Sequence, residues 1–159
     1  MELRPLTAID FDFLASFTGD PEFSDPMLAS EEQRHRNLQA ALEQPEHHAV
    51  LGVFREGKQT GLFVFLALRE EKYLELLAGL SKDPETYEAV LSYLAKAYPG
   101  WSGDFVFNPR NRLLASALRK RDAEFYPEQQ KLAFAGAVPK INTDGIVPFS
   151  EEYAAAYFS

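Results

Sequence analysis

The spacing of apolar residues predicts one short strand and two helices at the start of the chain. Residues 1–6 alternate as far as a proline, which indicates a first strand. From about Ala8 the apolar residues recur at helical spacing and predict a first helix. Ser30 and Gln33 resemble a capping box, so we expect a second helix that begins there and stops at Pro45.

The middle of the chain has the pattern of a three-stranded meander. Apolar segments at 47–54, 59–68 and 73–80 are rich in β-branched, aromatic and leucine residues. A tight glycine turn separates the first two segments, and a charged turn at 69–72 separates the last two. Adjacent strands joined by such short turns run antiparallel.

Beyond Leu80, helical and strand patterns alternate. We expect a helix at 84–98, a strand at 104–107, a helix at 110–121 and further strands around 124–127 and 130–136. This order predicts an α/β fold in which a mixed, twisted sheet of about six to seven strands is flanked by about four helices.

The two ends of the chain share a short pattern. Residues 3–7 and 146–150 each read as an apolar residue, any residue, proline, an apolar residue and a hydroxyl residue, and an acidic amphipathic run follows. We therefore divide the chain into a domain at 1–136 and a C-terminal extension at 137–159. One hypothesis is that the extension begins a second domain of the same kind; the alternative is a chance match.

Composition and charge narrow the class of protein. At 159 residues, of which 46% are hydrophobic, the chain can form one domain with a proper core. A net charge of -8 disfavours nucleic acid and anionic membranes as partners. The lack of cysteine excludes disulfides, thiolate zinc sites and a cysteine nucleophile. The acidic N-terminus is unlike a signal peptide and no apolar run approaches a membrane span, so we expect a cytoplasmic protein.

The segment 104–125, DFVFNPRNRLLASALRKRDAEF, carries a recognisable motif. Asn108, Pro109 and Asn111 form an Asn-Pro-x-Asn sequence between a predicted strand and a predicted helix, and Lys120 lies near the end of that helix. This arrangement resembles the GNAT superfamily of acetyl-CoA-dependent N-acetyltransferases. The resemblance implies a GNAT-like fold, acetyl-CoA as the cofactor, and a small-molecule or peptide amine as the partner that accepts the acetyl group.

The same segment also has a purely structural explanation. Asn108 or Asn111 can accept an early backbone N–H of the next helix, and Pro109 ends the strand because it has no N–H to donate. Two interpretations of Asn111 stay open. It caps the helix only, or it also contacts the acyl-CoA, as the resemblance implies.

The stretch 79–86, GLSKDPET, departs from the family at the loop that holds the CoA diphosphate. The family uses glycines there, so that backbone amides at a helix start surround the diphosphate. In this chain Asp83 is a natural N-cap, Pro84 has no N–H, and Glu85 adds negative charge. One carboxylate about 4 Å from a phosphate oxygen costs on the order of 4 kcal/mol at an effective dielectric of about 20. We therefore expect no diphosphate at this helix start.

A second departure concerns the proton donor. Overlaying the family motif places Leu118 where a tyrosine usually protonates the departing thiolate, and leucine cannot donate a proton. Tyr126 lies a few residues farther on. It either replaces that tyrosine or serves as a packing residue.

Glu75 is the candidate general base, because some GNAT relatives carry the base on the corresponding strand. Strict alternation would place Glu75 on the same face of the strand as Tyr73, Leu77 and Gly79. The alternative is that Glu75 is solvated at a sheet edge or paired with a lysine. The resemblance further implies that the backbone of Leu77, Ala78 and Gly79 binds the pantetheine arm of the cofactor.

Other charged groups give weaker indications. Five of the sixteen basic residues lie between 110 and 121. They form either an anion site or a solvated face of the predicted helix, near its C-terminus, where the helix dipole favours positive charge. The three histidines do not converge in the sequence pattern, so no metal site is expected.

Two functions follow from these observations. The first is acetyl-CoA-dependent N-acetyl transfer. The second is a catalytically silent GNAT-fold lobe that packs against a second domain of the same polypeptide, or against another copy, and shapes its substrate site or its oligomer. The resemblance favours the first, whereas the missing glycines and Leu118 favour the second.

Overall fold

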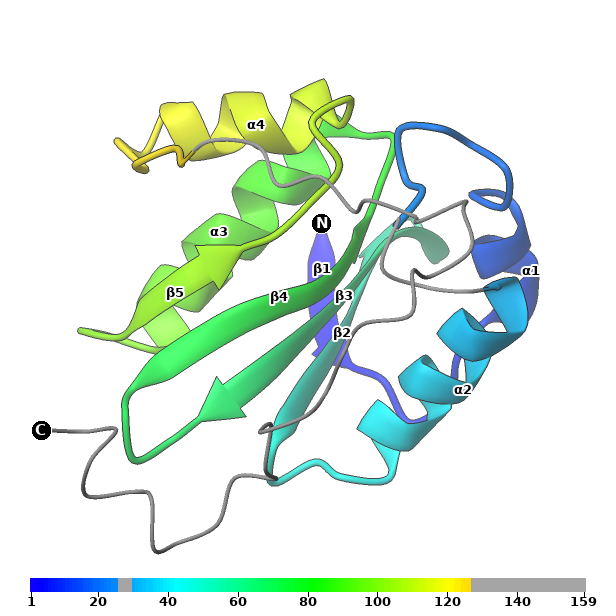
Figure 1. Ribbon diagram of the computed structural model, residues 1–159, viewed down its shortest axis with the longest axis horizontal. Helices are drawn as coiled ribbons and strands as arrows, with labels where there is room; N and C mark the ends of the chain where they lie inside the picture. Colours follow the sequence, from blue (N-terminus) through cyan, green and yellow to red (C-terminus); the bar gives the residue numbers. More distant parts are fainter. Residues whose placement is uncertain (26–29, 127–159) are drawn as a thin grey trace, which may run out of the picture.

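The computed structural model describes residues 1–25 and 30–126, which form four helices and five strands (Figure 1). In chain order these are β1 (Glu2–Pro5), α1 (Phe11–Ala15), α2 (Glu31–Leu42), β2 (His48–Arg55), β3 (Lys58–Leu68), β4 (Tyr73–Leu80), α3 (Pro84–Ala97), β5 (Ser102–Phe105) and α4 (Arg112–Arg119). The strands expected around 124–127 and 130–136 and the extension at 137–159 lie outside the described residues, except for residues 124–126, which form no strand.

The five strands of the described ranges form one sheet in the order β1-β2-β3-β4-β5. Strands β1 to β4 pair antiparallel, which confirms the predicted meander, and β5 pairs parallel to β4. The architecture is the predicted α/β fold around a mixed sheet, with fewer strands in this part of the chain than the roughly six to seven expected. β5 begins at Ser102, before the predicted 104–107, because its pairing with β4 sets its limits.

Capping side chains define where the first two helices begin. The Ser30 hydroxyl accepts a hydrogen bond from the Gln33 amide at 3.2 Å, which confirms the predicted start of α2. Asp10 caps α1 in the same way, so this short helix begins after Asp10 and not near Ala8 as expected. Within the described ranges, no helix combines the length and apolar character needed to cross a bilayer.

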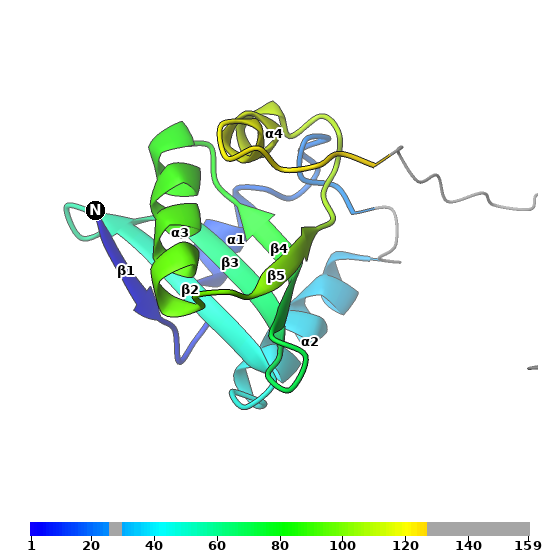
Figure 2. The same cartoon turned by 90° about the vertical axis from the view of Figure 1, so that its left-hand side faces the viewer.

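The helices cover both faces of the sheet, with α1 and α2 on one face and α3 and α4 on the other (Figures 1 and 2). The buried cluster under α3 and α4 includes Leu51, Val53, Phe63, Phe65, Leu74, Leu76 and Leu114. The cluster under α1 and α2 includes Leu14, Phe17, Leu38, Val50, Leu62, Val64 and Leu80. Burial of each such side chain contributes about 1.5–3 kcal/mol, so the sheet is held between two apolar layers.

A β-bulge at Leu77 interrupts the pairing of β4 with β3. Ala78 pairs with Val64, and Leu76 pairs with Phe65, so Leu77 has no partner in β3. An extra residue of this kind shifts the side-chain alternation by one position.

The residues of β4 that follow the bulge lie on the opposite face of the sheet from the one that strict alternation predicts. Glu75 lies on the α1/α2 face, and beyond the bulge this face carries Ala78 and Leu80, while Gly79 lies on the α3/α4 face. The expectation that Glu75 shares a face with Gly79 is therefore wrong, because strict alternation assumes that no residue is inserted, and Leu77 is the inserted residue itself.

Strands β4 and β5 pair over only part of their length. Residues 73–76 of β4 pair with residues 102–105 of β5. β4 then continues along β3 to Leu80, whereas the chain leaves the sheet after Phe105 and turns toward α4 (Figure 2). Among the described residues, the β5-facing edge of 77–80 therefore has no strand partner.

Gly61 allows the first turn of α3 to lie directly on β3. A methyl group at Gly61 would lie 2.6 Å from Cγ2 of Thr86, well inside van der Waals contact. Thr86 is fully buried, and its hydroxyl lies 3.1 Å from that of Thr60. The lack of a side chain at Gly61 therefore sets how closely α3 approaches the sheet.

Candidate active site at the divergence of β4 and β5

In the described part of the chain, the backbone of β4 that extends beyond β5 has no strand partner on that side. Leu77, at the bulge, is 44% exposed, whereas Ala78 and Gly79 are half-buried. Backbone N–H and C=O groups at such an edge can pair with an extended ligand as they would with another strand. The structure thus brings the three residues whose backbone was expected to bind a cofactor to one accessible edge.

Glu75 lies between two neighbouring strands and not at the edge of the sheet. Its cross-strand neighbours are Leu66 in β3 and Asp104 in β5, and its side chain is half-buried. Within residues 1–25 and 30–126, no lysine or arginine forms an ion pair with Glu75. A carboxylate in this position can accept a proton or a hydrogen bond from a ligand on the α1/α2 face.

Tyr73 and Asp104 form a polar pair beside Glu75. A hydrogen bond to the Asp104 carboxylate raises the pKa of Tyr73 to about 12, and desolvation and the negative charges of Asp104 and Glu75 act in the same direction. The phenol is therefore a proton donor held by a carboxylate, next to a second carboxylate.

Sequence reasoning placed Tyr73 on the face of Glu75 but missed Asp104 as a member of this cluster. Asp104 lies in a strand that is far from Glu75 along the chain, and only the parallel register of β4 and β5 makes the two neighbours. Parallel strands joined through a helix leave no turn from which such a register can be predicted.

The backbone donors at the start of α3 are occupied by the chain itself. The Asp83 carboxylate accepts hydrogen bonds from the Glu85 amide at 3.0 Å and from the Thr86 hydroxyl at 3.1 Å. The Thr86 amide donates to the Asp83 carbonyl, and the Asp83 amide donates to the Ser81 hydroxyl, both at 3.1 Å. Pro84 has no N–H. The predicted cap at Asp83 is confirmed, and the first turn keeps no free amide at these positions.

The basic side chains around this turn are also paired. Arg55, at the end of β2, places Nη2 at 2.8 Å from the Asp83 carboxylate and at 2.7 Å from that of Glu85. Lys82 lies 3.0 Å from the carboxylate of Asp20. The start of α3 is therefore closed by internal ion pairs.

Asn111 is buried and uses both ends of its side-chain amide. Its oxygen accepts a hydrogen bond from the Leu114 amide at 3.1 Å, and its nitrogen donates to the Tyr87 hydroxyl at 3.0 Å. Tyr87 in turn donates to the Ser81 carbonyl at 2.9 Å, and burial raises the pKa of its phenol to about 12. With an exposure of 3%, Asn111 fits the capping interpretation better than contact with a cofactor.

Asn108 connects two loops that are far apart in the sequence. Its amide nitrogen donates to the carbonyl and the hydroxyl of Ser24, at 3.0 and 3.1 Å. Its oxygen accepts from the Arg110 amide at 3.0 Å. The connection between β5 and α4 is therefore tied to the connection between α1 and α2.

Leu118, at the motif position of the proton donor, and Tyr126, the tyrosine considered in its place, lie in opposite environments. Leu118 is buried in the cluster under α3 and α4, where its side chain is a packing element. Tyr126 is 79% exposed, and its hydroxyl donates to Glu124 at 3.4 Å. In the described part of the chain, neither Leu118 nor Tyr126 interacts with the cluster of Tyr73, Glu75 and Asp104.

The basic cluster at 110–121 divides into paired and unpaired residues. Lys120 forms an ion pair with Glu88 at 2.8 Å, and Arg121 donates to the Ser92 hydroxyl at 2.6 Å. Arg110, Arg112 and Arg119 form no ion pair among the described residues, and the Arg119 guanidinium lies over the Phe125 ring at 4.7 Å from its centroid. Arg110 and Arg112 therefore remain open to an outside anion.

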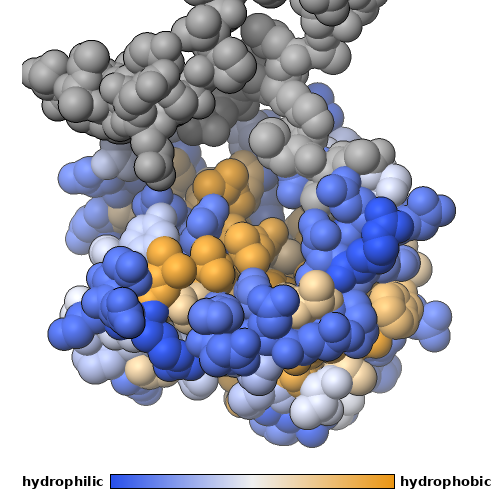
Figure 3. Space-filling view, turned by 60° about the horizontal axis from the view of Figure 1, so that its bottom comes forward, coloured by the Kyte–Doolittle hydropathy of each residue, from blue (hydrophilic) through white to orange (hydrophobic). Residues whose placement is uncertain are grey.

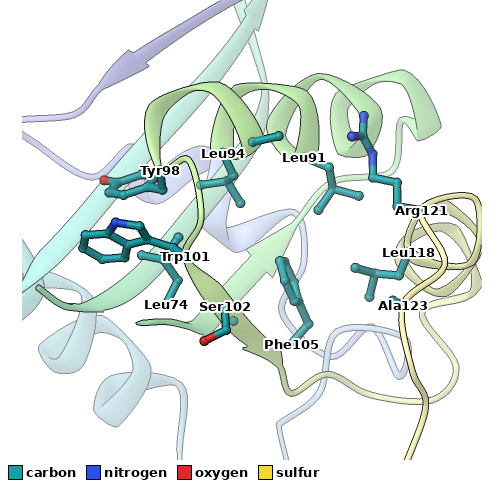
Figure 4. Close-up of a pocket in the computed structure, with 12 residues that line it drawn as sticks. Leu74, Leu91, Leu94, Tyr98, Trp101, Ser102, Phe105, Leu118, Arg121 and Ala123 are labelled. Atoms are coloured by element: carbon teal, nitrogen blue, oxygen red, sulfur yellow. The ribbon is translucent and has the colours of Figure 1, made fainter. Parts of the chain in front are cut away.

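An apolar cavity of about 230 Å³ lies between α3, β5 and the end of α4 (Figure 4). Its walls include Leu74, Leu94, Trp101, Phe105 and Leu118. It lies on the α3/α4 face, whereas Glu75 is on the opposite face, and Arg121 is its one charged lining residue in the described part of the chain. A cavity with so few polar groups offers packing and not acid–base chemistry.

The surface of the molecule also carries an apolar area. Figure 3 shows hydrophobic residues gathered in a hollow at the centre of one face, with hydrophilic residues around them. Leu77 and Val106, near the divergence of β4 and β5, are 44% and 67% exposed.

Within the described ranges, no three histidine, aspartate or glutamate side chains are placed to hold a metal ion.

Comparison with known proteins identifies the fold. No protein-family model and no curated protein matches the sequence. Wild-type TTHA1254 of Thermus thermophilus aligns with a TM-score of 0.54 and 15% identity, over 87% of this chain and 100% of its own. A "putative acetyltransferase" of Agrobacterium tumefaciens gives 0.53 and 15%, over 84% and 100%. A "probable acetyltransferase" gives 0.55 and 12%, over 89% and 100%. The described domain has a GNAT-like fold, as the sequence motif predicts.

Proposed function

We propose that the protein transfers an acetyl group from a pantetheine thioester, in the first instance acetyl-CoA, to the amine of a small molecule or peptide. The observation that carries this proposal is the divergence of β4 and β5 after Leu76, within a GNAT-like fold. Within residues 1–25 and 30–126, no strand pairs with the β5-facing backbone at 77–79, which can pair with the amide groups of a pantetheine arm.

Of the parts of acetyl-CoA, the pantetheine arm suits the described surface and the diphosphate does not. The open edge at 77–79 suits an extended arm that contains amide groups. The start of α3 does not suit a diphosphate, because its amides are bonded internally and Asp83 and Glu85 face the same space. The proposal therefore rests on recognition of the arm and involves no contact with a diphosphate at α3.

Glu75 is the proposed proton acceptor. As the amine forms its bond to the acetyl carbon and the carbon–sulfur bond breaks, the amine loses a proton, and Glu75 lies on the α1/α2 face two residues before the open edge. Leu118 cannot return a proton to the departing sulfur, so the thiol takes its proton from solvent. Much of the rate can come from holding the two reactants together.

Acetyl-CoA binding and acetyl transfer test this proposal directly. Titration calorimetry should show binding near about 1 μM to 100 μM, in the range of ordinary enzyme–substrate affinities. Transfer to a panel of primary amines and peptides can be followed by release of free thiol, and the absence of cysteine in the chain removes the protein background from this assay. No binding and no thiol release with any amine would overturn the proposal.

A second candidate function is a catalytically silent lobe, which the closed start of α3 specifically favours. In that case the GNAT-like domain packs against another domain of its own polypeptide or against a second copy, and it binds no acyl donor. The same titration separates the two candidates. Sedimentation of the chain in solution then reports whether a second copy is the partner.

A further inference from the structure

We infer that this chain recognises its acyl donor by the pantetheine arm alone, so that its donor class is acyl-pantetheine thioesters in general and the nucleotide diphosphate stays in solvent. This inference rests on the proposed function and makes it more specific. It follows from the contrast between an open strand edge at 77–79 and a closed helix start at 83–86.

The first step concerns the donors at the start of α3. The amides of Asp83, Glu85 and Thr86 all have partners within the turn, and Pro84 has none to offer. A diphosphate could reach the Glu85 amide only by displacing the Asp83 side chain from its cap. It could reach the Thr86 and Asp83 amides only by breaking their bonds to the Asp83 carbonyl and the Ser81 hydroxyl. Either exchange gains little over the bonds that already exist.

The second step concerns charge. The carboxylates of Asp83 and Glu85 share the guanidinium of Arg55, at 2.8 and 2.7 Å, so the cation nearest to the turn is already neutralised. One turn farther along α3, Glu88 lies 2.8 Å from Lys120 and 4.0 Å from Arg121, so it adds no net negative charge. An incoming diphosphate therefore meets two carboxylates that share a single cation, and their net negative charge opposes the attraction of the helix dipole.

The third step concerns the arm. Among the described strands none pairs with the β5-facing edge at 77–79, and Leu77 and Val106 are exposed apolar residues of β4 and of the segment after β5. A pantetheine arm has amide groups that can pair with the edge and methylene groups that can cover this surface. The energy of donor binding is therefore concentrated in the arm and the acyl thioester.

Two donors that differ only in the nucleotide test the inference. The dissociation constants of acetyl-pantetheine and acetyl-CoA, measured on the whole chain by calorimetry, should agree within about threefold. Adenosine 3′,5′-diphosphate, the nucleotide part of CoA, should not compete with acetyl-pantetheine. Acetyl-CoA binding that is tighter by about a hundredfold or more would overturn the inference while leaving the proposed function intact. Failure of both donors to bind would instead overturn the proposed function.

An isosteric double variant tests the physical cause. In D83N/E85Q, asparagine keeps the helix cap and both carboxylate charges are lost, so Arg55 becomes free to meet a phosphate. Affinity for acetyl-CoA should rise about tenfold relative to acetyl-pantetheine. The control D12N/E32Q removes two carboxylates from the first turns of α1 and α2, and it should leave the ratio unchanged. An unchanged ratio in D83N/E85Q, with thermal unfolding as in the wild type, would contradict exclusion by these carboxylates.

A matched variant tests an alternative anion contact. Arg110 and Arg112 lie at the start of α4 without an ion pair in the described part of the chain. If they bound the diphosphate, R110Q/R112Q would weaken acetyl-CoA and spare acetyl-pantetheine. The inference predicts that both donors bind this variant with the same affinity as the wild type, and a selective loss of acetyl-CoA binding would overturn it.

Discussion

Asn111 donates a hydrogen bond of 3.0 Å from its side-chain amide to the hydroxyl of Tyr87, and thereby joins the cap of α4 to the interior of α3. The Tyr87 hydroxyl in turn donates a hydrogen bond of 2.9 Å to the Ser81 carbonyl, just before α3 begins. Tyr87 is 1% exposed and Asn111 is 3% exposed, so water does not replace these bonds. One buried polar chain therefore fixes the starts of both helices on this face of the sheet.

The substitution Y87F should destabilise the fold by about 1–3 kcal/mol, because it leaves the buried Asn111 amide and the Ser81 carbonyl without their partner. The change removes a single oxygen and keeps the ring in the apolar cluster. Urea unfolding followed by circular dichroism measures the loss. Tyr98 supplies the control, since its hydroxyl makes no hydrogen bond within the described ranges, and Y98F should change stability by less than about 0.5 kcal/mol. Equal losses in both variants would refute the role of the buried chain.

The close approach of α3 to β3 predicts that G61A is destabilising by about 1–3 kcal/mol. The added methyl group would lie 2.6 Å from Cγ2 of Thr86, so the helix or the strand must shift. The substitution T86S removes this methyl group and keeps the hydroxyl that bonds to Asp83. The double variant G61A/T86S should therefore recover part of the stability lost in G61A, measured by thermal unfolding. If the stability changes of G61A and T86S simply add in the double variant, the contact between residues 61 and 86 does not set the helix position.

The pairing of Tyr73 with Asp104 predicts a distinct titration. Its hydrogen bond to Asp104 raises the pKa of Tyr73 to about 12, so D104N should return this pKa toward its ordinary value of 10.0. A raised tyrosine pKa means that the protonated phenol stabilises the fold. This contribution is complete below pH 10.0 and is lost as the pH rises through about 12. Since the chain has seven tyrosines, phenolate absorbance must be compared with that of Y73F. An identical Tyr73 titration in D104N would contradict the pairing.

Local rules explain the parts of this fold that the sequence predicts well. The caps at Ser30 and Asp83 depend on neighbouring residues only, and both helix starts are confirmed. The meander follows from short turns between apolar segments, which fix antiparallel pairing. The Asn-Pro-x-Asn motif indicated the GNAT-like fold through its resemblance to a family sequence, and it lies between β5 and α4, as expected.

The parts that the sequence does not predict depend on contacts between distant segments. No residue type marks the bulge at Leu77, which arises from the pairing of β4 with β3 and reverses the face that follows it. The proximity of Glu75 and Asp104 depends on the parallel register of β4 and β5. The partner of Asn111 is Tyr87 on another helix, so the sequence could show its capping role but not its second hydrogen bond.

The position of Glu75 gives the last prediction, which concerns catalysis. If Glu75 accepts the proton of the attacking amine, E75Q should lower kcat by about a hundredfold, because glutamine keeps the shape but cannot take the proton. Binding of acetyl-pantetheine should stay unchanged, since the proposed contacts of the arm are to the backbone at 77–79. The control E71Q makes the same change in the turn between β3 and β4 and should leave kcat unaltered.

A comparison with D104N then separates proton transfer from positioning. Asp104 holds the phenol of Tyr73 beside Glu75, so its loss should reduce kcat less than E75Q does and should leave the donor affinity unchanged. If E75Q instead keeps kcat within about twofold of the wild type while D104N abolishes turnover, the base is Asp104, since both carboxylates lie at one cross-strand position. If both variants keep full activity, neither carboxylate takes the proton, and catalysis rests on holding the reactants together.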